Sequence, residues 1–282
     1  MPLPPPPPLG SHMLPADTYA GQVVVVTGGG TGLGKAMAVE FARLGAAVVI
    51  ASRKPEHRDS GVRAIEALGA KALGVALDVR DPDAITATFD AAEEALGPAD
   101  VLINNAAGNF PAQAVKMSPN AWRSVVDIVL NGTFLCSTEF ARRALARSAP
   151  GAILNIGATY SWTGGPGTAH SAAAKAGVTN LTQSLAVEWA PHGIRVNCLA
   201  PGKFPHDDLP EVLRKTSTPE QDAGRIPGGR VGEPRELGWA ATYLCSPFAS
   251  YLTGHTLVLD GANWLRRSLT MPEFTSIEEQ LP

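Results

Sequence analysis

A glycine-rich turn at residues 27–34 is the first feature whose spacing points to chemistry. It reads TGGGTGLG, follows the apolar run VVVV and leads into a segment of helical period. Glycines allow positive φ angles, and they let backbone N–H groups approach an anion at a helix N-terminus. The alternative, a glycine loop of no consequence, is disfavoured by the strand before the turn and the helix after it. We therefore predict that a dinucleotide pyrophosphate binds at Gly28, Gly30, Thr31, Gly32 and Leu33.

The end of the second apolar run indicates which dinucleotide binds. A carboxylate at that point hydrogen-bonds a free ribose 2′-OH, whereas a cation accommodates a 2′-phosphate. The chain has Ser52 and Arg53 there, and the first carboxylate comes only at Glu56. This pattern predicts NADPH, and the alternative is a solvated basic pair on a loop. Further along, we expect Asp78 and Val79 beside the adenine and Asn105 under the adenosine ribose.

Short β-branched runs alternate with segments of helical period along most of the chain. The expected strands lie at 23–26, 47–51, 72–77, 101–104, 152–156, 195–199 and 256–259. The expected helices lie at 34–44, 60–68, 83–95, 119–147, from near 171, and 237–245. Right-handed crossovers would place helices on both faces of one parallel sheet, with ligands at the carboxyl ends of its strands.

The fold class is therefore α/β: a single doubly wound Rossmann domain with a seven-stranded parallel sheet, spanning residues 14–282. The Pro-rich segment 1–13 is expected to be an expression tag or a disordered leader. The irregular stretch 203–232 is rich in Pro, Gly and charge, and it is expected to be a loop that covers a substrate.

Composition excludes several classes of function. The net charge of −3 offers no broad positive field, so nucleic acid is not an expected partner. The three cysteines stand in apolar segments, which favours buried thiols over disulfides, and no zinc-type spacing occurs. No apolar run approaches the roughly 18 residues that span a bilayer. The expected location is the cytoplasm.

The chain resembles the short-chain dehydrogenase/reductase family from residue 14 onward. The resemblance rests on the glycine-rich turn, Asp78, the NNAAG run at 104–108, Asn131, Lys175 and the pair Pro201 and Gly202. In that family a Tyr four residues before the Lys is the general acid, and a Ser thirteen residues earlier binds the substrate oxygen. Here those positions hold Ser171 and Ala158. A Ser hydroxyl is shorter and far less acidic than a phenol, so ordinary ketone reduction is not expected.

One branch of the family, the NADPH-dependent 2,4-dienoyl-CoA reductases, has Ser at this position and its working Tyr on the preceding loop. Tyr160 fits that arrangement, and the segments 109–110, 117–122, 127–133, 171–177 and 224–230 match as well. The resemblance implies hydride addition to a conjugated thioester, which gives a 3-enoyl-CoA. It implies Tyr160 and Asn109 as donors to the developing oxyanion, with Ser171 and Lys175 holding a proton-delivering water.

Further roles follow from the same resemblance. Lys175 would bind the nicotinamide ribose, and Pro201, Gly202 and Phe204 would contact the cofactor. Asn131 is a further candidate catalytic residue, and a helix-bending water site is the alternative for it. Substrate contacts would come from Arg80, Phe110, Ser118 and Tyr160. The branch carries an Arg for CoA after the Pro-Gly pair, where this chain reads KFPHDD; Lys203 or Arg214 could substitute. A homotetramer is implied.

Three functions stay open at this point. The first is reduction of a 2,4-dienoyl-CoA. The second is reduction of another enoyl or 3-oxoacyl thioester, or of a secondary metabolite. The third is a non-catalytic NADPH-binding protein. Tyr160 could be a half-buried loop tyrosine, Asn109 a turn residue and Lys175 an exposed helix lysine.

Overall fold

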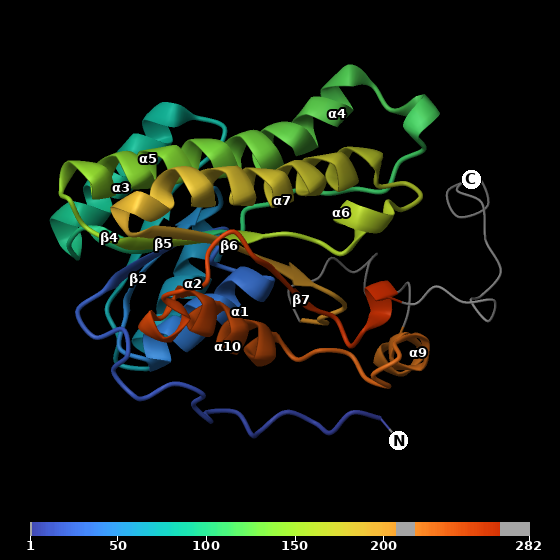
Figure 1. Cartoon of the computed structure of the whole chain (residues 1–282), viewed down its shortest axis with the longest axis horizontal. Coiled ribbons are helices and arrows are strands. Elements are labelled where there is room, and N and C mark those ends of the chain that lie inside the picture. Colours follow the sequence, from blue (N-terminus) through green and yellow to red (C-terminus); the bar gives the residue numbers. More distant parts are fainter. Residues whose placement is uncertain (1, 207–217, 266–282) are drawn as a thin grey trace.

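The computed structural model describes residues 2–206 and 218–265. Seven parallel strands form one sheet in the order β3-β2-β1-β4-β5-β6-β7 (Figure 1). Their bounds are β1 (Val23–Thr27), β2 (Ala47–Ser52), β3 (Ala72–Ala76), β4 (Ala99–Asn104), β5 (Gly151–Ile156), β6 (Ile194–Pro201) and β7 (Thr256–Leu259). The seven predicted strands are all present, so the predicted doubly wound α/β fold is confirmed.

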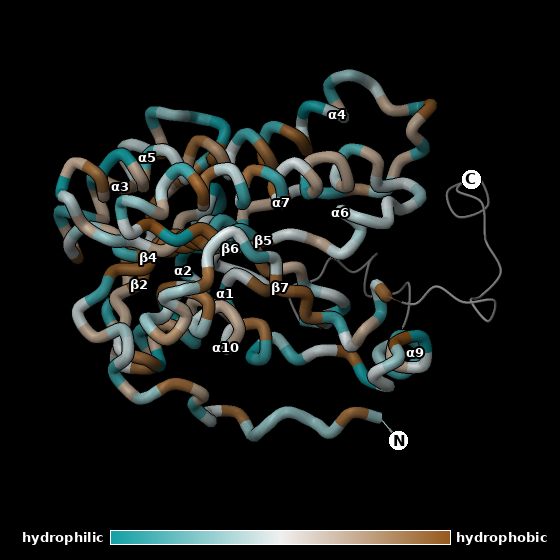
Figure 2. Tube along the Cα trace, viewed as in Figure 1, coloured by the Kyte–Doolittle hydropathy of each residue, from teal (hydrophilic) through white to brown (hydrophobic). Residues whose placement is uncertain are grey.

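The long helices cover both faces of the sheet (Figure 1). On one face lie α1 (Gly32–Arg43), α2 (Pro55–Glu66) and α10 (Pro234–Cys245). On the other lie α3 (Pro82–Ala95), α4 (Pro119–Val126), α5 (Gly132–Ala146) and α7 (Ala169–Trp189). Because helices cover both faces of the sheet, a central strand such as β1 is buried at all five residues, and its first four are valines. Figure 2 shows the strands among the most hydrophobic stretches of the chain.

The predicted single helix at 119–147 is divided by a π-helical turn over Asp127–Asn131, which joins α4 to α5. The wider turn carries an extra residue, a feature that hydrophobic periodicity does not reveal. The Asn131 side chain closes this turn, because its Nδ2 donates to the Asp127 carboxylate at 2.9 Å. Asn131 itself is exposed.

Short elements complete the described chain. They are α6 (Tyr160–Thr163), α9 (Pro219–Arg225) and 3₁₀ turns at Ala114–Lys116, Ala190–His192, Pro247–Ala249 and Asn263–Leu265. The Pro-rich segment 2–13 runs beside the segment 228–235: the Leu3 N–H donates to the Gly228 carbonyl at 2.8 Å, and Arg230 Nε donates to the Pro4 carbonyl at 3.0 Å. Among the described helices, none has the length and apolar character needed to cross a bilayer.

Candidate functional site

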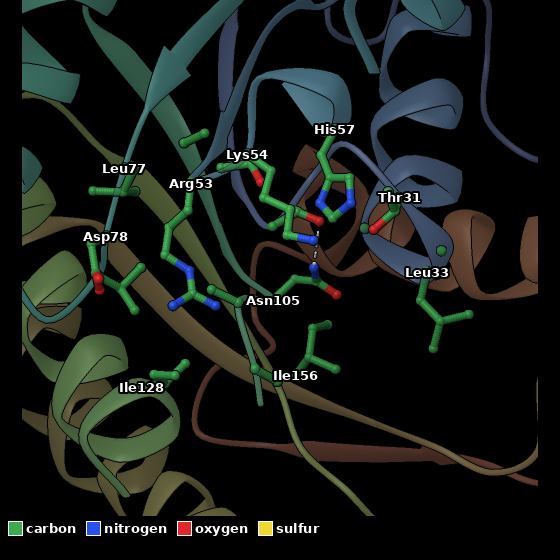
Figure 3. Close-up of a pocket in the computed structure, with 18 of the residues that line it drawn as sticks. Thr31, Leu33, Arg53, Lys54, His57, Leu77, Asp78, Asn105, Ile128 and Ile156 are labelled. Atoms are coloured by element: carbon green, nitrogen blue, oxygen red, sulfur yellow. Dashed lines mark hydrogen bonds between the residues drawn. The ribbon is translucent and has the colours of Figure 1, made fainter. Parts of the chain in front are cut away.

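A pocket of about 440 Å³ opens at the carboxyl ends of the central strands (Figure 3). It lies where the strand order reverses between β1 and β4, the place at which doubly wound sheets bind ligands. Its walls come from the turn after β1, the ends of β2 and β3, the segment after β4, and the start of the segment after β5. The topology therefore brings together loops that are far apart in the sequence.

The glycine-rich turn forms one wall of this pocket. Gly28 has a φ of +65°, and a Cβ added there would lie 3.0 Å from the Asn105 amide nitrogen and 3.2 Å from the Ala106 Cα. The turn leads into α1, whose first turn carries no acidic residue and whose N-cap, Thr31, makes no side-chain capping bond. The positive end of the α1 dipole is thus presented at the pocket, as a pyrophosphate requires.

The end of β2 supplies positive charge to the same pocket. Arg58 Nη1 donates to the Ser52 carbonyl at 2.9 Å and to the Arg53 carbonyl at 2.8 Å, which fixes the turn. The Arg53 side chain is left to reach into the pocket, as Figure 3 shows. Lys54 and His57 line the pocket beside it. This group suits a phosphate on the adenosine ribose.

The segment after β3 carries a close ion pair. Arg80 Nε donates to Asp78 Oδ1 at 2.9 Å, and hydrogen bonds from Arg80 lower the pKa of the Asp78 carboxyl to about 2. Asp78 lines the pocket, whereas Arg80, whose side chain is 44% exposed, lies outside its lining. The residues predicted for adenine and for CoA phosphate therefore contact each other.

Lys175 marks the other end of the pocket. It stands in the second turn of α7, it is buried, and its ammonium donates to the Ile156 carbonyl at the end of β5. Burial lowers the pKa of Lys175 to about 8, with a smaller opposing effect from the nearby Cys198. A buried lysine thus lines the pocket at the end of β5, where the cofactor and a substrate would meet.

Tyr160 and Ser171 form a hydrogen-bonded pair next to that lysine. The Tyr160 hydroxyl lies 3.0 Å from Ser171 Oγ, which joins the start of α6 to the first turn of α7. Ser171 is 1% exposed and Tyr160 is half-buried. Because Ser171 and Lys175 are four residues apart on α7 and both buried, they share one face of the helix. The sequence predicted Tyr160 on the loop that leaves β5; the structure places it at the first residue of α6, with its hydroxyl against Ser171.

A buried polar layer holds this part of the sheet in place. Asn104 Nδ2 donates to Ser137 Oγ and to Asn155 Oδ1, both at 2.9 Å, and Asn155 Nδ2 donates to Thr182 Oγ1 at 2.9 Å. These bonds connect β4 and β5 to α5 and α7 directly below the site. They fix the height of α7 along the sheet, and with it the position of Lys175.

The predicted cofactor residues divide into two groups. Those that line the pocket are Gly28, Thr31, Gly32, Leu33, Ser52, Arg53, Asp78, Val79, Asn105 and Lys175. Outside its lining are Gly30, which packs on the His57 carbonyl, and Pro201, Gly202 and Phe204. Phe204 is buried and lines a separate cavity of about 120 Å³ with Ile226.

The predicted substrate residues are more dispersed. Asn109 and Phe110 lie exposed on the segment after β4, and the Phe110 ring meets the His170 ring edge-on. Ser118 is the N-cap of α4, where its hydroxyl accepts from the Ala121 N–H at 3.1 Å. Lys203 pairs with Asp222 at 3.1 Å. Arg214, the other suggested CoA contact, lies outside the described residues.

Several pocket residues were not predicted from the sequence. His57 and His206 lie at the glycine-rich turn, and Leu77 and Ile128 add apolar surface. His206 packs against Gly32 from the segment after β6. No local pattern marks these residues, because each reaches the pocket through the fold and not through its spacing to the motif.

The remaining predicted chemistry concerns thiols and metals. Cys136, Cys198 and Cys245 are free and buried, as predicted, and burial raises their pKa values to about 12, 11 and 12. They are therefore poor nucleophiles at neutral pH. In the part of the chain that the structure describes, no group of His, Cys, Asp and Glu could hold a metal ion.

Comparison with known proteins places the fold and the site in context. A family profile described as Enoyl-(Acyl carrier protein) reductase matches residues 28–262. A probable 2,4-dienoyl-CoA reductase, (2E)-enoyl-CoA-producing, from Bacillus subtilis is 42% identical over 86% of this chain and 97% of its own length. The peroxisomal 2,4-dienoyl-CoA reductase, (3E)-enoyl-CoA-producing, of Rattus norvegicus is 39% identical over 90% and 87%.

A solved structure extends the comparison to a bound cofactor. A putative 2-deoxy-D-gluconate 3-dehydrogenase from Agrobacterium tumefaciens, solved with bound NADP, superimposes with a TM-score of 0.80 at 35% identity. It covers 89% of this chain and 99% of its own length. The sequence resemblance stated above is therefore confirmed.

Proposed function

Because this chain belongs to the short-chain dehydrogenase/reductase family, we propose that it is an NADPH-dependent reductase of 2,4-dienoyl-CoA thioesters. The observation that carries the proposal is the Tyr160–Ser171 pair at 3.0 Å beside Lys175. A hydroxyl approaches the usual tyrosine position, but it comes from α6 and has a different direction of approach. The relatives named as dienoyl-CoA reductases support the choice of substrate.

NADPH fits the residues of the pocket. A side chain on the glycines of the turn would collide with neighbouring residues, so their backbone stays open to a pyrophosphate. Arg53 and Lys54 supply positive charge where the adenosine ribose would lie. Lys175 would hold the nicotinamide ribose. NADPH, when bound, supplies the hydride for the reduction. The relative solved with bound NADP supports this choice of cofactor.

The chain's own residues would then handle charge and protons. Hydride addition to the far end of a conjugated dienoyl thioester leaves a dienolate with negative charge on the thioester oxygen. Tyr160 O–H and the Asn109 amide would donate to that oxygen, and the positive charge of Lys175 would stabilise it. Asn131 and the π-helical turn would hold the α5 side of the site, and Ser171 would orient the tyrosine hydroxyl.

The position of protonation determines the product. A dienolate can take its proton at C2, which gives a 3-enoyl thioester, or at C4, which gives a 2-enoyl thioester. The two named relatives differ on this point, since one is described as producing (2E)-enoyl-CoA and the other (3E)-enoyl-CoA. We propose protonation at C2, from a water held by Ser171 and Lys175. Product analysis by NMR in deuterated water would locate the new hydrogen.

The function is tested by offering 2,4-dienoyl-CoA, 2-enoyl-CoA and 3-oxoacyl-CoA to the protein with NADPH. Absorbance of the diene and of the cofactor should fall together. Tyr160→Phe should lower kcat by about 100-fold, the size of effect found when one oxyanion donor is removed. Tyr251→Phe is the matched control, because Tyr251 is fully exposed. Turnover of the ketone alone, or full activity of Tyr160→Phe, would overturn the proposal.

A second substrate class is favoured by the family profile, which is described as an enoyl-(acyl carrier protein) reductase. Residues 202–206, directly after β6, carry Lys203 but no Arg. A 2-enoyl thioester on a carrier protein is therefore the alternative, and the same assay distinguishes it when a 2-enoyl-carrier-protein thioester is offered beside the CoA thioesters. Several features remain proposals from the sequence. They are substrate contacts by Arg80, Phe110 and Ser118, a substrate loop at 203–232, a leader at 1–13, a homotetramer and a cytoplasmic location.

A further inference from the structure

His170 is a buried polar residue that the reaction described above does not use. It lies in the first turn of α7, directly before Ser171, and it is 0% exposed. It does not line the cofactor pocket. A fully buried histidine at this position has to be explained by its contacts.

One ring nitrogen of His170 is occupied. Nδ1 accepts a hydrogen bond from the Ser171 N–H at 2.8 Å, so the neutral ring carries its proton on Nε2. Nε2 is buried and has no hydrogen-bond partner among the described residues. A buried donor without an acceptor destabilises a fold, so an apolar side chain would serve better if packing were its only role.

The ring of His170 also contacts the segment after β4. The rings of His170 and Phe110 meet edge-on, with centroids 4.7 Å apart and planes at 89°. Close by, the Ala112 N–H donates to the Gly167 carbonyl at 2.9 Å. The segment that carries Asn109 and Phe110 is thus attached to the start of α7 at two points.

These contacts link the two proposed oxyanion donors. On one side, His170 fixes the backbone of Ser171, whose hydroxyl holds Tyr160. On the other, it supports Phe110, the neighbour of Asn109. We propose that His170 is a positioning residue for the reduction: it sets the Asn109–Phe110 segment relative to the Tyr160–Ser171 pair. This inference rests on the proposed reductase function, and it adds a residue that acts through others.

The test is a double-mutant cycle between His170 and Phe110. His170→Asn keeps an acceptor where Nδ1 lies but removes the ring, and Phe110→Leu removes the other ring. Each should lower kcat by about 10- to 100-fold, since misplacement by about 1 Å has effects of that order. The double variant should be no slower than the slower single variant, because both changes break the same contact. Affinity for NADPH, measured by fluorescence, should stay within about twofold in all three.

Other outcomes would overturn the inference. Independent, multiplicative losses in the cycle would mean that His170 does not act through Phe110. A matching loss of NADPH affinity would indicate general disruption of the fold. His170→Gln, which keeps a donor at the Nε2 level but lacks the ring, should be as slow as His170→Asn; full activity would assign the role to the donor instead. The cycle is run on whichever thioester the unmodified protein reduces. A wrong substrate assignment therefore shows in the unmodified protein, before any variant is compared.

Discussion

Replacement of Lys175 by Met should raise the free energy of unfolding of the cofactor-free protein at neutral pH. Burial lowers the pKa of Lys175 from 10.5 to about 8, and one pKa unit corresponds to about 1.36 kcal/mol. The charged lysine therefore costs the fold about 3 kcal/mol at pH 7. Met has a similar length and no charge, but it loses the hydrogen bond to the Ile156 carbonyl, worth about 1 kcal/mol. The variant should be about 2 kcal/mol more stable.

The pH dependence gives a sharper test than the single value. The folded pKa of Lys175 lies below the unfolded one, so the unfolded chain binds more protons between about pH 8 and 10.5. Stability therefore rises with pH in that window, and the cost falls from about 3 kcal/mol at pH 7 to about 1 kcal/mol at pH 9.5. The buried thiols act in the opposite direction, because burial raises their pKa values. Both proteins contain the three thiols, but only in the unmodified protein does Lys175 partly lower the pKa of Cys198.

Urea unfolding of both proteins without cofactor, at pH 7 and pH 9.5, measures the effect. The advantage of Lys175→Met should shrink by about 2 kcal/mol between the two pH values. Activity should fall by about 100-fold or more at both, because the charge next to the oxyanion is gone. The argument is that burial of the charged lysine costs folding free energy. A variant that is less stable than the unmodified protein at pH 7, or a stability advantage that does not change with pH, would refute it.

Three further substitutions test the cofactor pocket. Arg53→Ala should raise the KM for NADPH about 10- to 100-fold and leave that for NADH nearly unchanged, since a charged hydrogen bond to phosphate is lost; equal effects on both cofactors would exclude a 2′-phosphate contact. Gly30→Ala should weaken cofactor binding and lower the melting temperature, because a methyl group there collides with the α2 backbone; Gly224→Ala, with open space around it, is the control, and equal behaviour of the two would contradict the packing argument. Asp78→Asn should cost about 1 kcal/mol at pH 6 after allowance for solvent exposure. The pKa of Asp78 is lowered to about 2 by Arg80, so its contribution is present above about pH 4 and disappears between pH 4 and 2; a difference that persists at pH 2 would argue against the ion pair.

The sheet could be predicted because its physical cause is local in the sequence. A strand covered by helices on both faces is mostly apolar along its length, and β1 begins with four consecutive valines. Helix starts were less accurate: 60–68 was expected where α2 runs over Pro55–Glu66, because Pro at the first position begins the helix early. The π-helical turn at Asp127–Asn131 was not predicted, since one extra residue barely alters an apolar period.

A site residue could be predicted only where its residue type, at a given place in the fold, usually has a single function. The glycine turn and Arg53 meet that condition, because they are fixed by the strand that precedes each of them. His57, His206 and His170 do not, because their roles come from contacts with partners distant in the sequence or on other elements. A histidine in a helix carries no sign of which surface it will meet.

The Ser at position 171 can be understood as part of a rearranged site and not as the loss of one. A buried Ser hydroxyl without a partner would be a cost, whereas here it lies 3.0 Å from a phenol that comes from another element. The same helix turn carries His170, which contacts the segment that supplies Asn109. The start of α7 is therefore the place where α6, the segment after β4 and the lysine meet. Under the proposed function, a donor on α6 would approach the thioester oxygen from another direction than a tyrosine on α7. The Ser at position 171 would then orient the phenol of Tyr160 and not act as the acid itself.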